Sequence, residues 1–163
     1  MTSLGVEADP DDIEVALRYR AEQFAFGDMY ESIRAIETGL HRLVREVLEG
    51  EHGIGEKGWW RKSVPLSIRQ KCVDRREEDE EPADDPYAYT DLLDLARIAE
   101  KEWQTVSARL PKDAAANRKR FVQDLERMNR IRRMVMHPVR GLFPSEDDFQ
   151  FVHDLERKLG LNK

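Results

Sequence analysis

Apolar residues recur along this chain at the spacing of one face of a helix, and no segment shows the apolar–polar alternation of a half-buried strand. The clearest stripe lies in Tyr30–Glu51, where seven apolar side chains follow steps of three, four, three, one, three and one residues. Weaker stripes predict a preceding helix over Asp11–Phe26 and a following one that begins at Ser63-Val64-Pro65 and runs through Cys72. Glycines in 50–58 predict the end of the second helix, because a left-handed backbone costs glycine little.

Three further helices are predicted in the second half of the chain, over Thr90–Leu110, Asp113–Pro138 and Ser145–Gly160. Thr90 can cap the first of them, and Pro138 ends the second because a residue before proline is pushed out of the α region. Ser145 followed by Asp148 resembles a capping box. The sequence therefore predicts an all-α bundle of five or six helices.

The composition agrees with one domain rather than two. The chain has 163 residues, and we predict a single helical domain over 10–160 behind a flexible N-terminus at 1–9. Charged residues make up 37% of it, against about 25% in a typical protein, and no apolar run approaches the roughly 20 residues of a membrane span. The first twelve residues carry four acids and no base, unlike a signal peptide. We therefore expect no membrane association and a cytoplasmic location.

The charges are distributed unevenly, and the net charge of −6 hides this asymmetry. The segment Arg118–Arg140 holds eight bases and two acids, a local charge of 8 − 2 = +6. The segment Asp74–Asp94 holds ten acids and two bases, a local charge of 2 − 10 = −8, and includes a solvated acidic loop predicted at 77–88. Because the local field decides where a polyanion can bind, the basic segment is the candidate site for RNA.

Other chemically suggestive residues have simpler explanations. Gly53–Gly58 matches the glycine spacing of a dinucleotide-binding loop, but that chemistry needs a preceding strand, so we interpret it as a link between helices. Cys72 lies on an apolar stripe and is expected to be a buried, inert thiol. Trp59 and Trp60 could stack on bases, although a core position is the more common role. The sequence predicts no metal site and no cofactor.

The end of the basic helix is different, because it combines cations with a histidine. Arg133 and His137 are one turn apart, and guanidinium groups bind phosphate while imidazole can transfer a proton near neutral pH. We assign phosphate or RNA binding to Asn129, Arg130, Arg133 and Arg140. A basic, solvated helix face whose histidine only interacts with the helix C-terminus would explain the same residues.

The motif resembles that of the HEPN superfamily, all-α domains marked by an arginine and a histidine separated by four residues. Arg132–His137 fits this spacing, and the following proline is common among members. The segments 58–62, 64–65, 68–69, 89–95 and 98–103 resemble one branch, found on a eukaryotic nuclear mRNA quality-control endonuclease and on bacterial proteins. The similarity covers roughly 30–159.

The resemblance implies a homodimer in which two Arg/His pairs meet in one cleft and cleave RNA without metal, in a toxin, phage-defence or RNA-processing role. By motif position, Arg132 takes the phosphate-binding role and His137 the acid–base or orienting role, so these two are the predicted catalytic residues. Arg133 departs from the pattern, because this position usually holds a polar residue, often Asn, whose hydrogen-bond acceptor an arginine lacks.

Two alternatives to the nuclease stay open at this stage, a non-catalytic module and a generic helical scaffold whose basic helix binds anionic surfaces. A non-catalytic HEPN module could bind RNA, a nucleotide or a neutralising or effector partner protein. The acidic loop could also cover the cleft of its own or a partner subunit as a mimic of RNA.

Overall fold

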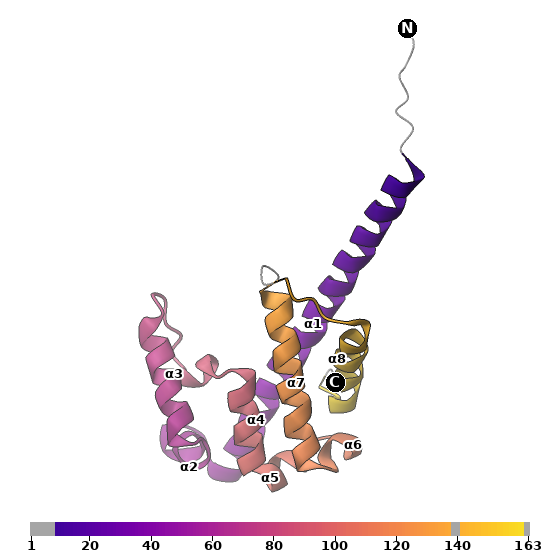
Figure 1. The fold of residues 1–163 in the computed structure, drawn as a ribbon. Coiled ribbons are helices and arrows are strands. Elements are labelled where there is room, and N and C mark those ends of the chain that lie inside the picture. Colours follow the sequence, from indigo (N-terminus) through magenta and orange to yellow (C-terminus); the bar gives the residue numbers. More distant parts are fainter. Residues whose placement is uncertain (1–8, 138–140, 162–163) are drawn as a thin grey trace.

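The structure, a computed structural model, describes residues 9–137 and 141–161, and for residues 12 and 15–26 it describes the backbone alone. Within these residues it is entirely helical and contains no strand, which confirms the predicted all-α class (Figure 1). The elements in chain order are α1 (Pro10–His52), η1 (Glu56–Trp60), α2 (Arg61–Ser63), α3 (Leu66–Glu78), η2 (Pro86–Tyr89), α4 (Leu92–Lys101), α5 (Trp103–Ser107), α6 (Lys112–Ala115), α7 (Arg118–Met136) and α8 (Glu146–Leu159). Several are single turns, so the described part holds eight α-helices rather than five or six.

Helix α1 is one continuous helix of 43 residues, and the prediction of two helices over 11–26 and 30–51 is wrong. Asp9 caps it, with its side chain accepting a hydrogen bond from the backbone N–H of Asp11 at 3.1 Å. Gly27 lies inside the helix, because a single glycine costs only about 1 kcal/mol and no proline interrupts the hydrogen bonds. The N-terminal part projects beyond the other helices (Figure 1).

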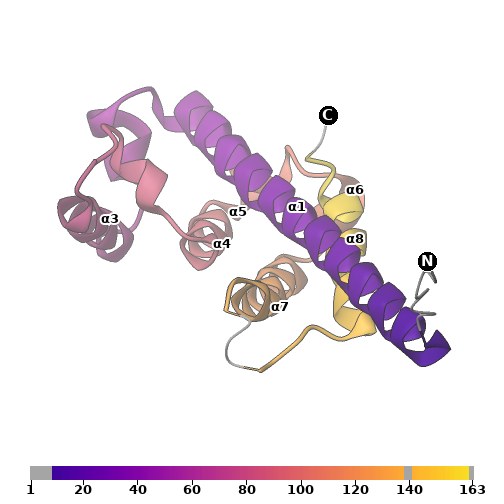
Figure 2. The same ribbon diagram turned by 90° about the horizontal axis from the view of Figure 1, so that it is seen from above.

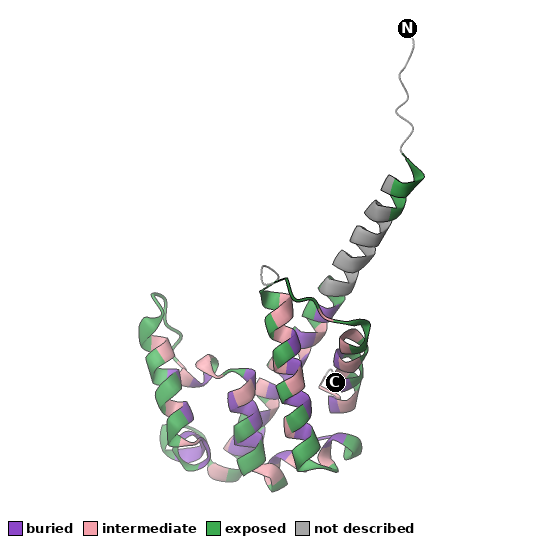
Figure 3. Cartoon of the chain, viewed as in Figure 1, coloured by how far each residue is buried: buried purple, intermediate pink, exposed green. Residues whose placement is uncertain are grey.

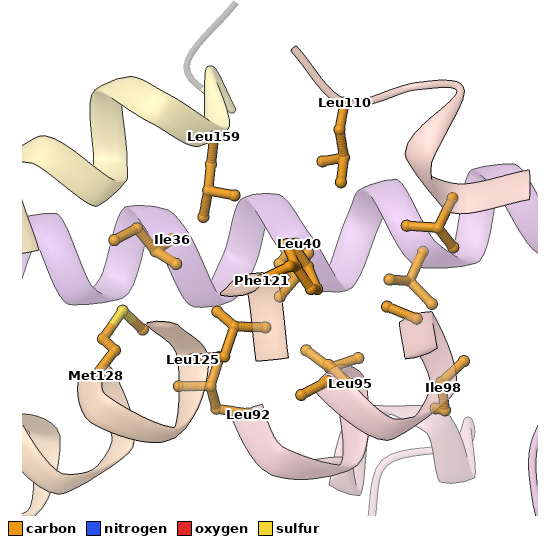
Figure 4. Close-up of a cluster of buried hydrophobic side chains, with 14 of the residues drawn as sticks. Ile36, Leu40, Leu92, Leu95, Ile98, Leu110, Phe121, Leu125, Met128 and Leu159 are labelled. Atoms are coloured by element: carbon orange, nitrogen blue, oxygen red, sulfur yellow. The ribbon is translucent and has the colours of Figure 1, made fainter. Parts of the chain in front are cut away.

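The remainder of α1 forms the centre of the bundle and contacts α4, α5, α7 and α8. Its apolar stripe faces those of the other helices, and Figure 2 shows α3, α4 and α7 in succession along one side of it. The buried side chains at the centre (Figure 4) include Ile36, Leu40, Leu95, Ile98, Phe121, Leu125, Met128 and Leu159. The stripe predicted in 30–51 is therefore the main core-forming surface of the chain.

The glycine-rich stretch after α1 is a tight link between helices, as interpreted from its sequence. Gly53 and Gly55 have φ values of 89° and 94°, which side chains rarely adopt. The Gly53 carbonyl accepts a hydrogen bond from the Trp59 backbone N–H at 2.9 Å. Trp59 and Trp60 are buried and contact each other edge to face, which confirms their predicted core role.

The N-caps of the later helices agree with the sequence at one position and differ at two. Ser145 and Asp148 form the predicted capping box at the start of α8. Helix α4 is capped by Asp91, because the Thr90 hydroxyl instead donates to the Tyr87 carbonyl at 2.8 Å.

Helix α7 begins at Arg118 rather than at the predicted Asp113, which lies in the separate turn α6. Asn117 supplies its N-cap by accepting a hydrogen bond from the Arg120 backbone N–H at 3.0 Å. The predicted stop at Pro138 lies outside the described residues. No helix in the described part combines the length and the apolar character needed to span a bilayer.

The acidic loop is exposed but is held by specific hydrogen bonds. The Tyr89 hydroxyl donates to the Asp79 carboxylate at 2.7 Å and accepts from the Ala83 backbone N–H at 2.8 Å. Arg76 donates to the Ala83 carbonyl at 2.7 Å. These bonds attach the loop to α3 and η2, and both views place α4 between α3 and α7 (Figures 1 and 2).

Candidate functional site

Helix α7 carries the predicted site and is anchored by a buried stripe. Phe121, Leu125, Met128 and Ile131 face the core, Asp124 is buried beside them, and the remaining residues of the helix are half-buried or exposed (Figure 3). The spacing of these four residues places the cations of the helix outside the core. The sequence therefore uses one face of α7 for packing and leaves the rest for charge.

Three cations of α7 are neutralised by acids from this chain. Arg120 pairs with Asp124 at 3.0 Å. Arg127 pairs with Asp148 of α8 at 3.3 Å, and its guanidinium also lies 4.1 Å from the centre of the Phe151 ring. The third is Arg132, described below.

Four cations of α7 have no acidic partner within the described part of the chain, and all four are exposed. They are Arg118 and Lys119 near its start and Arg130 and Arg133 near its end. An exposed cation without an intramolecular partner can bind a phosphate without first breaking an ion pair. The two ends of α7 are therefore the regions of the basic segment most available to a polyanion.

Arg132 points toward α1, where its Nε contacts the Glu37 carboxylate. Both contacting atoms are shielded from water, although the Arg132 side chain as a whole stays 38% exposed. Sequence analysis missed Glu37, because nothing in a helical stripe shows which acid of α1 will lie opposite α7. The arginine predicted to bind phosphate, Arg132, is therefore already paired with an acid of α1.

Arg133 lies on a different side of α7 and lines a cavity of about 270 Å³ between α4 and α7. Asn129 and Arg130 line the same cavity, so the structure brings together three of the predicted phosphate-binding residues. Arg97 of α4 adds a further cation that sequence analysis did not identify, and Glu126 is the one acid in the lining. The cavity is a small basic pocket of a size that suits a phosphate or sugar group.

His137 follows the last residue of α7 and is exposed. Its backbone N–H still donates to the Arg133 carbonyl at 3.0 Å, but its φ of −130° and ψ of 61° leave the helix. The position one turn beyond Arg133 agrees with the predicted geometry. Arg140 lies outside the described residues.

Cys72 lies on α3 and does not line the cavity beside Arg133. No group of three His, Cys, Asp or Glu side chains converges within the described residues. Burial, reinforced by the nearby Asp94 charge, raises the pKa of Cys72 to about 11. The thiol is buried on the core side of α3, as its stripe predicted.

No protein-family model, curated protein or solved structure matches the chain. The HEPN resemblance therefore rests on the motif and segments quoted from the sequence, and it remains a prediction.

Proposed function

We propose that the protein is a metal-independent endoribonuclease of the HEPN type that acts as a homodimer. The observation that carries the proposal is the end of α7, where the exposed His137 imidazole follows the exposed Arg133 guanidinium by one turn. Asn129 and Arg130 lie beside Arg133 around a small basic cavity. This arrangement offers phosphate binding and proton transfer at one place.

The proposed reaction is transesterification within the RNA. His137 accepts the proton of a 2′-hydroxyl, whose oxygen then forms a bond to the adjacent phosphorus. The bond from phosphorus to the 5′-oxygen breaks, and the imidazolium of the second subunit returns a proton to that oxygen. The products are a 2′,3′-cyclic phosphate and a 5′-hydroxyl, and no metal or redox partner is needed.

The arginines stabilise the charge that builds up on the phosphate. The contact with Glu37 fixes Arg132 through Nε while the guanidinium stays partly exposed, which supports a positioned rather than a mobile cation. Arg133 supplies a second cation on the neighbouring side of the helix, and it has no acidic partner within the described residues. Electrostatic stabilisation of this kind accounts for about 10²–10³ in rate per donor in well-studied enzymes.

The test is cleavage of a single-stranded RNA in EDTA by matched histidine variants. His137→Ala should lose at least about 100-fold in cleavage rate, because a proton-transfer group contributes about 10²–10⁴. His153→Ala, which removes another exposed histidine from α8, should cleave like wild type. Wild-type products should carry cyclic-phosphate ends. Equal cleavage by His137→Ala and wild type would overturn the assignment.

A second candidate is a non-catalytic RNA-binding module, and the Arg132–Glu37 ion pair favours it. A cation already neutralised by a shielded carboxylate is a weaker phosphate ligand, and Arg133 cannot provide the acceptor of the usual Asn. This candidate predicts that the protein binds RNA in a salt-dependent manner and forms no cleavage product. It also predicts that the His137→Ala variant binds RNA as tightly as wild type does.

A further inference from the structure

A cavity larger than the one beside Arg133 lies away from α7, between the turn after α1 and helix α3. Its volume is about 680 Å³, within the roughly 300–1,000 Å³ of typical ligand pockets. Trp59 and Trp60 form its buried floor. Figure 1 shows α2 and α3 on the opposite side of α4 from α7, so this groove is separate from the proposed RNA site.

Three exposed apolar side chains gather on this groove. Ile54, Leu66 and Val73 are 84%, 57% and 49% exposed, and all three line it. Leu66 and Val73 are seven residues apart on α3, so they lie on one face two turns apart. Exposed apolar side chains that converge on a cavity mark a binding surface more often than scattered ones do.

The arginines at the rim of the groove already have partners within the chain. Arg45 pairs with Asp85 at 2.6 Å, and Arg61 pairs with Glu56 at 3.0 Å. Arg69 donates its Nε to the Val64 carbonyl at 3.1 Å. The positive charge around the groove is therefore largely neutralised or engaged.

Two lining carboxylates, Asp74 and Asp84, have no hydrogen-bonded or ionic partner among the described residues. The exposed acids of 77–81 follow Asp74 along the chain. The surrounding segment 74–94 carries a local charge of −8. The lining itself holds four acids and three arginines, and this excess of negative charge beside exposed apolar side chains favours an occupant that is both apolar and cationic.

We propose that this groove binds a basic, amphipathic helical segment of a partner protein. Apolar side chains at one-turn spacing fill the groove over the tryptophan floor, against Leu66 and Val73. Lysines or arginines on the flanks of that segment pair with Asp74 and Asp84. The proposal does not depend on the RNA chemistry, because none of these residues belongs to α7.

The experiment measures binding of a fluorescein-labelled peptide of about 18 residues by anisotropy, with Leu at one-turn spacing and Lys elsewhere. A control peptide replaces every Lys with Glu. The Lys peptide should bind wild type, and the Glu peptide should bind at least about tenfold more weakly. The Asp74→Asn, Asp84→Asn double variant should also weaken Lys-peptide binding and flatten its dependence on salt.

Three substitutions locate the peptide. Leu66→Glu and Val73→Glu should each weaken binding about tenfold, because a charge enters the apolar contact. Ile13→Glu changes a comparably exposed apolar residue on the projecting part of α1 and should leave affinity within about twofold. Far-UV circular dichroism confirms that each variant is folded.

Each other outcome overturns the proposal. Equal affinity for both peptides would show a groove that does not select charge. If Ile13→Glu and Leu66→Glu weaken binding of the Lys peptide equally, the peptide does not bind in this groove. A self-association of the protein that Leu66→Glu abolishes would make the groove an interface between copies of this chain. RNA cleavage by Leu66→Glu should match wild type, so failure here is distinct from failure of the proposed function.

Discussion

The Arg132–Glu37 ion pair controls how much of the charge of α7 a phosphate can reach. Glu37→Gln removes one negative charge beside Arg132 while nearly preserving the size of the side chain. We expect tighter binding of single-stranded RNA and a salt dependence steeper by about 0.7 in log–log slope, because one more cation becomes available. Titrations of labelled RNA at several salt concentrations measure both quantities.

A matched control separates this local effect from a change in net charge. Glu46→Gln removes the same charge from an exposed position of α1, whose only ionic contact in the described chain is Arg109 at 3.9 Å. It should leave the salt slope unchanged. If both variants behave like wild type, RNA does not reach Arg132, and the motif arginine has a structural role.

For single residues, the sequence predicted positions along one helix but not the contacts that residues of other helices make with it. The positions of Asn129, Arg133 and His137 follow from helical spacing, and the structure has them on the expected turns. Glu37 and Arg97 come from other helices, and only the packing of α1 and α4 against α7 brings them to the site. A single sequence contains no signal for such contacts.

The link between α1 and α2 requires a glycine at position 58, in addition to Gly53 and Gly55 with their positive φ values. A β-carbon on Gly58 would lie 2.3 Å from the Gly53 carbonyl oxygen, a backbone atom that cannot move away without breaking its bond to Trp59. Gly58→Ala should therefore lower the free energy of unfolding by about 2–3 kcal/mol. Urea unfolding followed by tryptophan fluorescence measures the change.

Gly50→Ala is the control for that substitution. Gly50 lies in the helical part of α1, and a β-carbon at this position would meet only open space, so alanine should stabilise by up to about 1 kcal/mol through helix propensity. Opposite signs for the two glycines are the expected result. A Gly58→Ala protein as stable as wild type would contradict the close approach.

The capping box of α8 makes a contribution to stability that depends on pH. Burial acts to raise the pKa of Asp148, but hydrogen bonds from Ser145 and Arg127 outweigh it and hold the pKa below its ordinary value. The carboxylate therefore stabilises the fold above the unfolded pKa of about 3.9, and this contribution is lost as pH falls through the lower, folded pKa.

Asp148→Asn should accordingly reduce the free energy of unfolding by about 1 kcal/mol at pH 7, and the difference from wild type should shrink below about pH 4. Chemical unfolding across that pH range measures it. Asp147→Asn, an exposed acid in the same helical turn, should have a smaller effect because it makes no capping bond. A difference that persists unchanged at about pH 2.5–3 would show that the carboxylate charge is irrelevant.

Helix existence was predictable at this scale, but helix boundaries were not. Stripes of apolar residues mark α1, α3, α4, α7 and α8, because each must bury one face. The position of a helix end depends on which of two neighbouring residues forms the cap, as with Asp91 and Thr90 before α4. It also depends on whether a helix continues through a glycine, as α1 does at Gly27. These choices differ by about 1 kcal/mol or less, which packing readily overrides.

For the whole molecule, the separation of charge sets the expected salt dependence of assembly. The acidic loop is attached next to α3, and α4 lies between α3 and α7, so the loop of one chain does not lie over the basic helix of the same chain. That the loop covers the cleft of a partner subunit stays a prediction. A dimer that brings two α7 helices together must overcome repulsion between like charges. Its association should therefore strengthen with rising salt, whereas RNA binding should weaken.

Light scattering over a range of salt concentrations checks this sign, with a protomer of 19.1 kDa as the reference. A particle of one protomer mass at every salt and protein concentration, with and without RNA, would contradict the dimer. The all-α class needed only periodicity, but dimerisation requires a surface match between two copies that periodicity does not encode.

The projecting start of α1 has a hydrodynamic consequence. At 1.5 Å per residue, the 43 residues of α1 form a rod about 65 Å long. A compact protein of 163 residues has a radius of gyration of about 15 Å, so the rod is much longer than twice that radius. Frictional drag on such a shape makes a lone protomer elute from a sizing column ahead of compact standards of equal weight, so early elution must not be counted as self-association.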